Sequence, residues 1–375
     1  HPIRFLRRTP AMKPVVTRLL RTGHAGMPTN EGLQQAFEQA RDAWNEHIPT
    51  LPEDRQPENW AGLKACVELA AKAATFSHHG RQIFMPGPQL LEMLSHTDLA
   101  SVRPGDVALP YNAFYVSFAA GTGLAFPGEP NEIDGVYVQV YRNTWELTVT
   151  CRRTGKPPKS QALWLAYPEP HFYATFVNNG DDATFADKIA DAVAEGEIST
   201  VVDPEALDAF RQTVEAAGHE KGIDARVPDT PLRQQIADFN ADALPVAERA
   251  LALAINAICY LTTQPDGAKI AYPSDAPETL TRDAKSGKTK GQRRRAAARL
   301  LDTGYYPIRL LDLDAPRTHG DTQAPLESAA NRRAHWRRGH WRRQPHGRGR
   351  ASINLKWIRP TFVSGTKPES DKARL

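Results

Sequence analysis

The chain has 375 residues, of which 41% are hydrophobic, 24% are charged and 30 are prolines. Because a single hydrophobic core stops growing at roughly 250 to 300 residues, these values predict a globular protein with at least two folding units and irregular connections. Cys66, Cys151 and Cys259 lie far apart without a Cys-x-x-Cys pair, so the sequence indicates neither a disulfide framework nor a cysteine zinc site and fits a reducing compartment.

The formal net charge of +4 conceals an uneven distribution along the chain. Residues 282–359 contain 20 basic and 6 acidic residues, a net charge of +14, whereas the remainder contains 27 basic and 37 acidic residues, a net charge of −10. A basic block favours a polyanionic partner because neutralised phosphates release condensed counterions, and the acidic remainder repels nucleic acid. Any nucleic-acid contact is therefore expected in the C-terminal third.

The predicted elements begin with helices. Residues 1–28 are rich in Arg and Pro and contain no secretory signal, and we expect them to form a mobile leader. Thr29 is expected to cap a helix whose apolar face consists of Leu33, Phe37, Ala40 and Trp44. A second amphipathic helix is predicted over 59–76.

A β-rich region follows. Aromatic and β-branched residues predict an antiparallel sheet, with strands at 112–118, 135–141, 145–151, 163–167 and 172–177. Helices are then predicted over 182–194, 205–217 and 245–261, the last being the expected central core helix. The apolar run 250–263 is too short for the roughly 30 Å hydrocarbon core of a bilayer, so no membrane span is expected.

These elements predict an α+β fold with a helical N-terminal segment, an antiparallel sheet, further helices and a C-terminal basic β-hairpin. The hairpin is expected from 335–343 and 353–359, preceded by a strand at 306–313. The predicted division of the chain is a leader at 1–28, an acidic α+β body at 29–265, a basic linker at 266–300 and a basic strand and hairpin region at 301–375.

The basic hairpin contains His-Trp-Arg-Arg twice with a period of five, starting at His335 and His340. Guanidinium groups bind phosphate as bidentate donors and aromatic rings stack on unpaired bases, so this pattern favours contact with single-stranded RNA. The predicted nucleic-acid-binding residues are Arg332, Arg333, His335, Trp336, Arg337, Arg338, His340, Trp341, Arg342, Arg343 and Lys356. The alternative is an edge hairpin whose Trp rings pack on the body, with Arg side chains that are solvated or paired with acidic residues.

The three histidines of this region, His335, His340 and His346, have neither a carboxylate nor a thiolate among them. Two or three histidines alone do not complete a metal shell or an acid–base pair. We therefore predict no metal, no cofactor and no catalytic residues, and favour a non-enzymatic protein while leaving the question of an enzyme open.

The run from His335 to Trp341, followed by Leu355-Lys356-Trp357 and by residues 362–365, resembles the end of the second type V-A anti-CRISPR family. The resemblance implies a phage or plasmid protein in the cytoplasm of a bacterial host. Because no membrane span is expected, no membrane partner is predicted. It implies recognition of a nascent client polypeptide, the N-terminus of a CRISPR effector, and loss of the encoding mRNA during translation. The implied partners are that peptide and the mRNA or ribosome.

Two alternatives remain at this stage, an RNA-binding ribonuclease and a plasmid or phage nucleic-acid-binding regulator. The sequence does not identify peptide-binding residues. A sheet edge at 112–118 is one place where an extended peptide could add as a strand.

Overall fold

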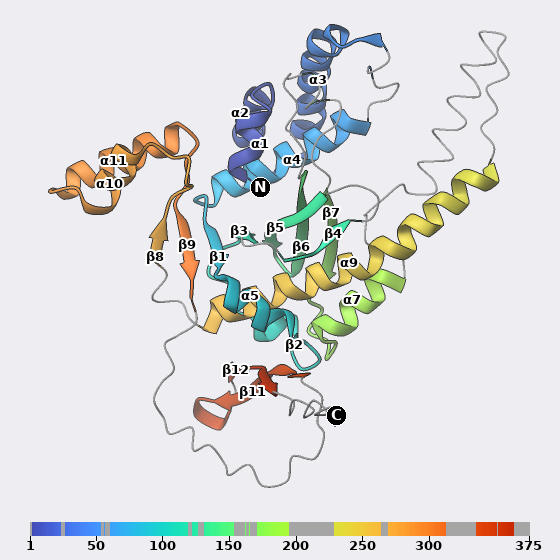
Figure 1. Cartoon of the computed structure of the whole chain (residues 1–375), viewed down its shortest axis with the longest axis vertical. Helices are drawn as coiled ribbons and strands as arrows, with labels where there is room; N and C mark the ends of the chain where they lie inside the picture. The colour runs from blue at the N-terminus through green and yellow to red at the C-terminus, as the bar shows by residue number, and fades with distance from the viewer. Residues whose placement is uncertain are drawn as a thin grey trace, which may run out of the picture.

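The computed structural model describes residues 2–23, 27–53, 56, 61–118, 122–126, 131–153, 162, 165, 171–194, 229–263, 269–312, 335–350 and 352–363. Within them, helices and a mixed β-sheet form the α+β fold that the sequence predicts (Figure 1). Of the predicted strand at 163–167 only Leu165 is described, and it is helical, so the prediction was wrong at that residue. The predicted helix at 205–217 lies outside the described residues.

The N-terminal region is a group of helices: α1 (Pro2–Arg8), α2 (Met12–Thr22), α3 (Asn30–His47), a short 3-10 turn η1 (Ile48–Thr50) and α4 (Ala61–His78). The expectation of a mobile leader over 1–28 was wrong, because α2 buries an apolar stripe consisting of Met12, Val15, Val16 and Leu19. The stripe has helical spacing, but the surrounding Arg and Pro residues obscure it in the sequence. The Thr29 cap is confirmed, since its Oγ1 accepts a hydrogen bond from the Gly32 N–H at 3.0 Å.

The sheet has the strand order β7-β6-β5-β3-β1-β9-β8, with β4 paired to β5. Its strands are β1 (Ile83–Pro86), β3 (Ala113–Ser117), β4 (Ala125–Phe126), β5 (Asn131–Tyr141), β6 (Thr144–Arg153), β7 (His171–Val177), β8 (Lys269–Ala271) and β9 (Ile308–Leu311). Neighbours among β3, β5, β6 and β7 are antiparallel, as predicted, but β1 is parallel to both β3 and β9. The short β1 was not predicted, and it makes the sheet mixed.

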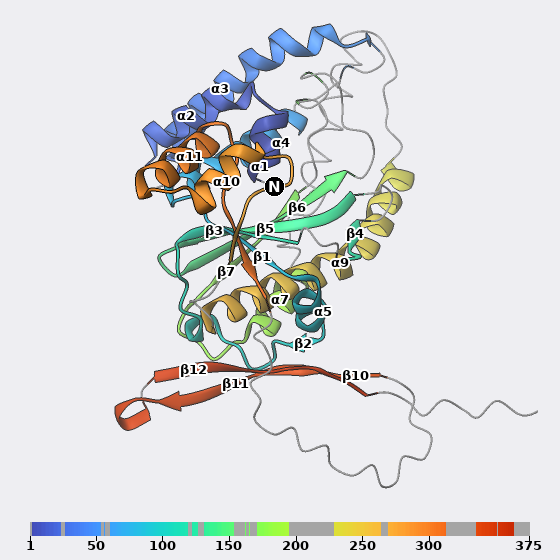
Figure 2. The same ribbon diagram turned by 60° about the vertical axis from the view of Figure 1, so that its left-hand side comes forward.

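Both faces of the sheet are covered. Phe114 and Val116 of β3 belong to the core cluster that includes α9 (Asp229–Thr263), whereas Tyr115 packs with Phe76 of α4 in another cluster. This alternation explains why every residue of β3 is buried. α5 (Pro88–Ser95) and α7 (Phe185–Ala194) pack beside α9 (Figure 2).

α9 is the central core helix that the sequence predicts, although it does not begin at Pro245 but continues through it. Its segment Ala241–Thr263 is long and apolar enough to cross a membrane, yet 72% of its most apolar part is buried inside the fold. The apolar character of α9 is therefore explained by its position between the sheet and its neighbouring helices.

The segment predicted as a linker at 266–300 instead contains β8, α10 (Glu278–Ser286) and most of α11 (Lys290–Asp302). Its two helices bury almost no apolar side chains and therefore do not need an apolar stripe. Without such a stripe, the sequence pattern did not predict them. The predicted C-terminal hairpin is confirmed by β11 (Gly339–His346) and β12 (Ser352–Ile358), which are flanked by β10 (His335–Arg337) and β13 (Thr361–Val363). Figures 1 and 2 show the α10–α11 pair well separated from the hairpin, at the side of the fold beyond β8.

Candidate functional site

The β11–β12 hairpin has one polar basic face and one aromatic face. Along β11, His340 and Arg342 are exposed whereas Gly339 and Trp341 are buried. The antiparallel register pairs Arg342 with Lys356 and Trp341 with Trp357, so each pair lies on one face. Residues 335–363 contain eight basic and no acidic residues. The outer face therefore carries the charge expected of a polyanion-binding surface.

Trp341 anchors the hairpin on the body. Its side chain is 0% exposed, and its Nε1 donates to Asn256 Oδ1 at 2.7 Å. The Asn256 amide in turn donates to the Leu94 carbonyl at 3.2 Å and to the Thr97 carbonyl at 2.9 Å. A fully buried indole cannot stack on a base, so the prediction that Trp341 contacts nucleic acid was wrong. Strand alternation directs this ring toward α9.

The other tryptophans also contact the body. Trp336 stacks on His96, with ring centroids 4.8 Å apart and an interplanar angle of 21°. Trp357 Nε1 donates to Thr97 Oγ1 at 3.2 Å, and the Trp357 ring meets Tyr260 of α9 edge-on at 5.4 Å. Packing of Trp on the body, which the sequence left open as an alternative, is thus what the structure shows for these rings.

Backbone contacts join the hairpin to the short strand β2 (Thr97–Asp98), which lies parallel to β11. The Gly339 N–H donates to the His96 carbonyl at 2.9 Å, and Ser101 Oγ donates to the Trp341 carbonyl. A Cβ atom at Gly339 would lie 2.6 Å from Pro360 Cδ, so this close approach requires glycine.

Arg343 pairs with Asp106 of the 3-10 turn η3 (Pro104–Asp106). Its Nη2 donates to Asp106 Oδ1 at 3.0 Å, and its Nε lies 2.8 Å from Oδ2. Asp106 also accepts a hydrogen bond from the Arg103 N–H at 3.2 Å. Burial, and secondarily the Asp106 charge, raises the pKa of the neighbouring Cys259 thiol, which keeps it protonated.

The predicted nucleic-acid-binding residues therefore separate into groups. Exposed side chains belong to Arg337, Arg338, His340, Arg342 and Lys356. Trp336, Trp341 and Arg343 contact the body, as described above. His335 is placed by its backbone in β10, and Arg332 and Arg333 lie outside the described residues. The structure thus brings five of the predicted side chains to the solvent within one hairpin region.

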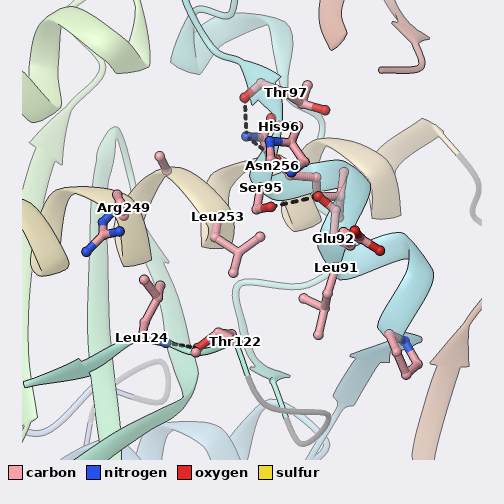
Figure 3. Close-up of a pocket in the computed structure, with 14 residues that line it drawn as sticks. Leu91, Glu92, Ser95, His96, Thr97, Thr122, Leu124, Arg249, Leu253 and Asn256 are labelled. Atoms are coloured by element: carbon pink, nitrogen blue, oxygen red, sulfur yellow. Dashed lines mark hydrogen bonds between the residues drawn. The ribbon is translucent and has the colours of Figure 1, made fainter. Parts of the chain in front are cut away.

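A cavity of about 580 Å³ lies beside the hairpin, between α5, α9 and the segment 122–124 (Figure 3). Figure 3 shows Leu91 and Leu253 pointing to the same side, toward the segment that contains Thr122 and Leu124. Glu92 and Arg249 are exposed and add opposite charges to its lining. The lining combines apolar side chains with about as many polar ones, and a cavity of this size is typical of a ligand site.

Two further hollows extend this cavity toward the hairpin. One, of about 360 Å³, shares Ser95, His96 and Thr97 with the first cavity. The other, of about 560 Å³, lies on β11 and shares Asp98 and Arg338 with the second. Because successive hollows share lining residues, the three are neighbours between the first cavity and the basic hairpin, and together we call them the groove.

Several residues of this region were not found by sequence reasoning, above all His96, Thr97, Asp106 and Asn256. Asn256 could have been predicted, because it is the one amide in the apolar run 250–261. A buried polar residue in such a run requires hydrogen-bond partners. The other three residues stand in loops or short elements whose positions depend on tertiary contacts.

The sheet edge expected at 112–118 is not available. β3 pairs with β1 on one side and with β5 on the other, so its backbone groups are already used. The proposed strand addition at this position was wrong because the unpredicted β1 occupies it. Within the described part of the chain, no group of three or more His, Cys, Asp or Glu residues is placed to hold a metal ion.

Comparisons with known proteins agree with the resemblance in the hairpin. A family model described as the anti-CRISPR type V subtype A2 family, AcrVA2-like, matches residues 84–365, from β1 through the hairpin. A match of this extent defines an anti-CRISPR protein. The chain belongs to the anti-CRISPR type V subtype A2 family.

Among solved structures, the chain is similar to one titled "Crystal structure of AcrVA2", with 12% sequence identity, 96% of each chain covered and a TM-score of 0.34. No curated protein sequence matches the chain. The anti-CRISPR function therefore follows from the family to which the chain belongs.

Proposed function

We propose that the protein recognises the N-terminal peptide of a nascent CRISPR effector and promotes loss of the encoding mRNA during translation. Membership of the anti-CRISPR family supports the class of target. The observation that carries the mechanism is the groove, because it connects a cavity of mixed apolar and polar lining, suited to a peptide, with a basic hairpin suited to RNA.

The peptide would occupy the groove in an extended conformation. An apolar side chain fits between Leu91 and Leu253, while Arg249 and Glu92 offer partners for the charged or polar groups of the peptide. Apolar contacts give affinity in such sites, and a few placed polar groups give specificity. The buried Trp341–Asn256 contact holds one side of the groove in place.

The outer face of the hairpin would contact the phosphates of mRNA or ribosomal RNA. Arg342 and Lys356 lie side by side there, and Arg337 and Arg338 are exposed nearby. A nascent peptide and its mRNA are held by the same ribosome, so engagement of both raises the effective concentration of the second contact. Weak RNA binding by the hairpin would therefore suffice.

Two reporters test recognition of the peptide. The first keeps the first few dozen residues of the client but uses fully recoded synonymous codons. The second keeps most nucleotides but shifts the reading frame, so that another peptide emerges. A protein groove reads side chains whereas recoding changes only the RNA, so we expect loss of the first mRNA and survival of the second. Loss of the frame-shifted message alone would contradict the proposal.

A substitution in the groove tests its role. Ala252 is half-buried on α9 and lines the first two hollows, so Ala252→Phe fills the groove. We expect it to abolish silencing of the recoded reporter while circular dichroism stays unchanged. Ala241→Phe, on an exposed position of the same helix, is the matched control. Equal silencing by both variants would exclude the groove as the peptide site.

A further inference from the structure

A second basic surface lies far from the hairpin. It consists of α10, α11 and the turn between them, residues 278–302, which we call the basic arm. Residues 282–299 contain eight basic residues and one acidic residue, Asp283. The arm is inserted between β8 and β9, which pair antiparallel at the end of the sheet. Figure 1 shows it projecting beyond β8, away from the hairpin.

The arm contributes little to the hydrophobic core. α10 buries no residue, and α11 buries only Ala296 and Leu300. Helices of globular proteins are ordinarily stabilised by packing of an apolar face. Core packing therefore does not explain the sequence of the arm.

The turn of the arm is nevertheless well defined. Thr289 caps α11 by accepting a hydrogen bond from the Gln292 N–H at 3.1 Å, and the Arg293 guanidinium donates to the Gly287 carbonyl at 2.8 Å. A Cβ atom at Gly287 would lie 2.5 Å from the Asp283 carbonyl oxygen, so glycine permits this close turn. A fixed turn presents the basic side chains in one arrangement, which lowers the ordering cost of binding.

The positions of the basic residues in α11 lower the stability of this helix. Lys290 and Arg294, and likewise Arg295 and Arg299, are four residues apart, a spacing at which like charges repel on a helix. Lys290 also lies in the first turn, where the helix dipole disfavours a positive charge. Among the described residues no ion pair joins Arg294, Arg295 or Arg299 to an acidic side chain. A polyanion would relieve this repulsion.

The residues between the charges indicate which polyanion. The solvent face of α11 carries Gly291 and Ala298 between its two basic rows, and residues 278–302 contain no aromatic residue. Such a face has nothing to stack on an unpaired base and little apolar surface for a protein partner, but it leaves guanidinium groups free to reach phosphates. Backbone phosphates of a duplex present rows of such acceptors without unstacked bases.

We propose that the basic arm binds the sugar–phosphate backbone of an RNA duplex, independently of the hairpin. The choice of RNA over DNA rests on the proposed function, which places the protein beside translated mRNA. Contact with phosphates alone is independent of sequence, so the arm would add affinity for structured RNA without selecting the client.

Fluorescence anisotropy of the full chain with a 20-base-pair RNA hairpin at several KCl concentrations tests the arm. The triple variant Arg294→Gln, Arg295→Gln, Arg299→Gln preserves helix propensity and removes three charges. We expect its log–log salt slope to fall by about 2 to 3, since each phosphate contact contributes about 0.9. The matched control, Lys13→Gln, Arg21→Gln, Arg41→Gln, removes three exposed charges from α2 and α3 and should keep the slope.

An unchanged slope in the arm variant overturns the inference, as does an equal loss in the control. Stronger binding to a DNA duplex of the same length, or to phosphatidylserine vesicles, also overturns it. These assays contain no ribosome, so they separate the two proposals. If reporter silencing depends on the peptide but the salt slope of the arm variant is unchanged, only RNA binding by the arm is refuted. If the salt slope falls but silencing does not depend on the peptide, only nascent-peptide recognition is refuted.

Discussion

The C-terminal hairpin and the basic arm have similar charge and opposite relations to the core. The hairpin inserts Trp341 into the main core cluster and pairs Arg343 with Asp106. The arm is joined through the β8–β9 pair and buries only Ala296 and Leu300 of α11. Charge density alone therefore does not show whether a basic segment packs on the core. Interleaved aromatic residues do show it, because they supply the apolar area that packs the strand on the body.

The difference also separates stability from binding. In the hairpin, inward residues determine folding and outward residues are free for a partner. In the arm, almost every basic side chain faces solvent, so its substitution should change binding far more than stability. The following variants test this contrast, beginning with the largest expected effect.

Replacing Trp341 by Ala removes the largest fully buried side chain of the described residues and leaves Asn256 Oδ1 without its donor. We expect the free energy of unfolding to fall by about 3 to 5 kcal/mol, measured by urea denaturation. Trp336→Ala is the matched control, because that ring is only half-buried and should cost less. Equal effects of the two substitutions would show that Trp341 does not anchor the hairpin.

Asn256→Ala removes the amide that joins α9, the Leu94 and Thr97 carbonyls and the Trp341 indole. Buried groups left without partners cost about 1 to 3 kcal/mol, so a loss in this range is expected in the same denaturation assay. Trp341→Phe deletes the donor from the other side. A double-mutant cycle should give a nonzero coupling energy, and strict additivity would argue against the contact.

Arg343→Ala should lower the free energy of unfolding by about 1 kcal/mol, because its partner Asp106 is nearly buried while Arg343 is 30% exposed. Arg342→Ala, one residue away on the outer face, should stay within about 0.5 kcal/mol of the wild type. The opposite ranking would mean that the outer face, not the inner one, is attached to the body. Thermal denaturation of the two variants side by side decides this.

The smallest effect is expected in the arm, with the opposite sign. Arg295→Glu turns the repulsive pair with Arg299 into an attractive one in the favourable orientation, which should stabilise the helix by about 0.2 to 0.5 kcal/mol. Arg295→Gln, which removes the repulsion without creating an attractive pair, is the control and should give a smaller gain. A loss of stability at Arg295 would show that the arm charges are part of the fold.

The sequence by itself determined the local elements that have strong patterns. The Thr29 cap, the core helix α9, the strands β5, β6 and β7 and the β11–β12 hairpin follow from capping chemistry, apolar runs and alternation, which act over a few residues. It also located the basic block and the motif that resembles the anti-CRISPR family. Weakly patterned elements such as α2, β1 and the arm were missed.

Only the tertiary structure decided which basic and aromatic residues face a partner. Trp336 and Trp341 belong to the same five-residue repeat, yet one ring is half-buried on His96 and the other is fully buried on Asn256. Arg342 and Arg343 are neighbours, and only the second meets Asp106, which lies more than 200 positions earlier in the chain. Such contacts join distant segments, so no local pattern specifies them; they exist because α9 and the loop after α5 meet the hairpin in space.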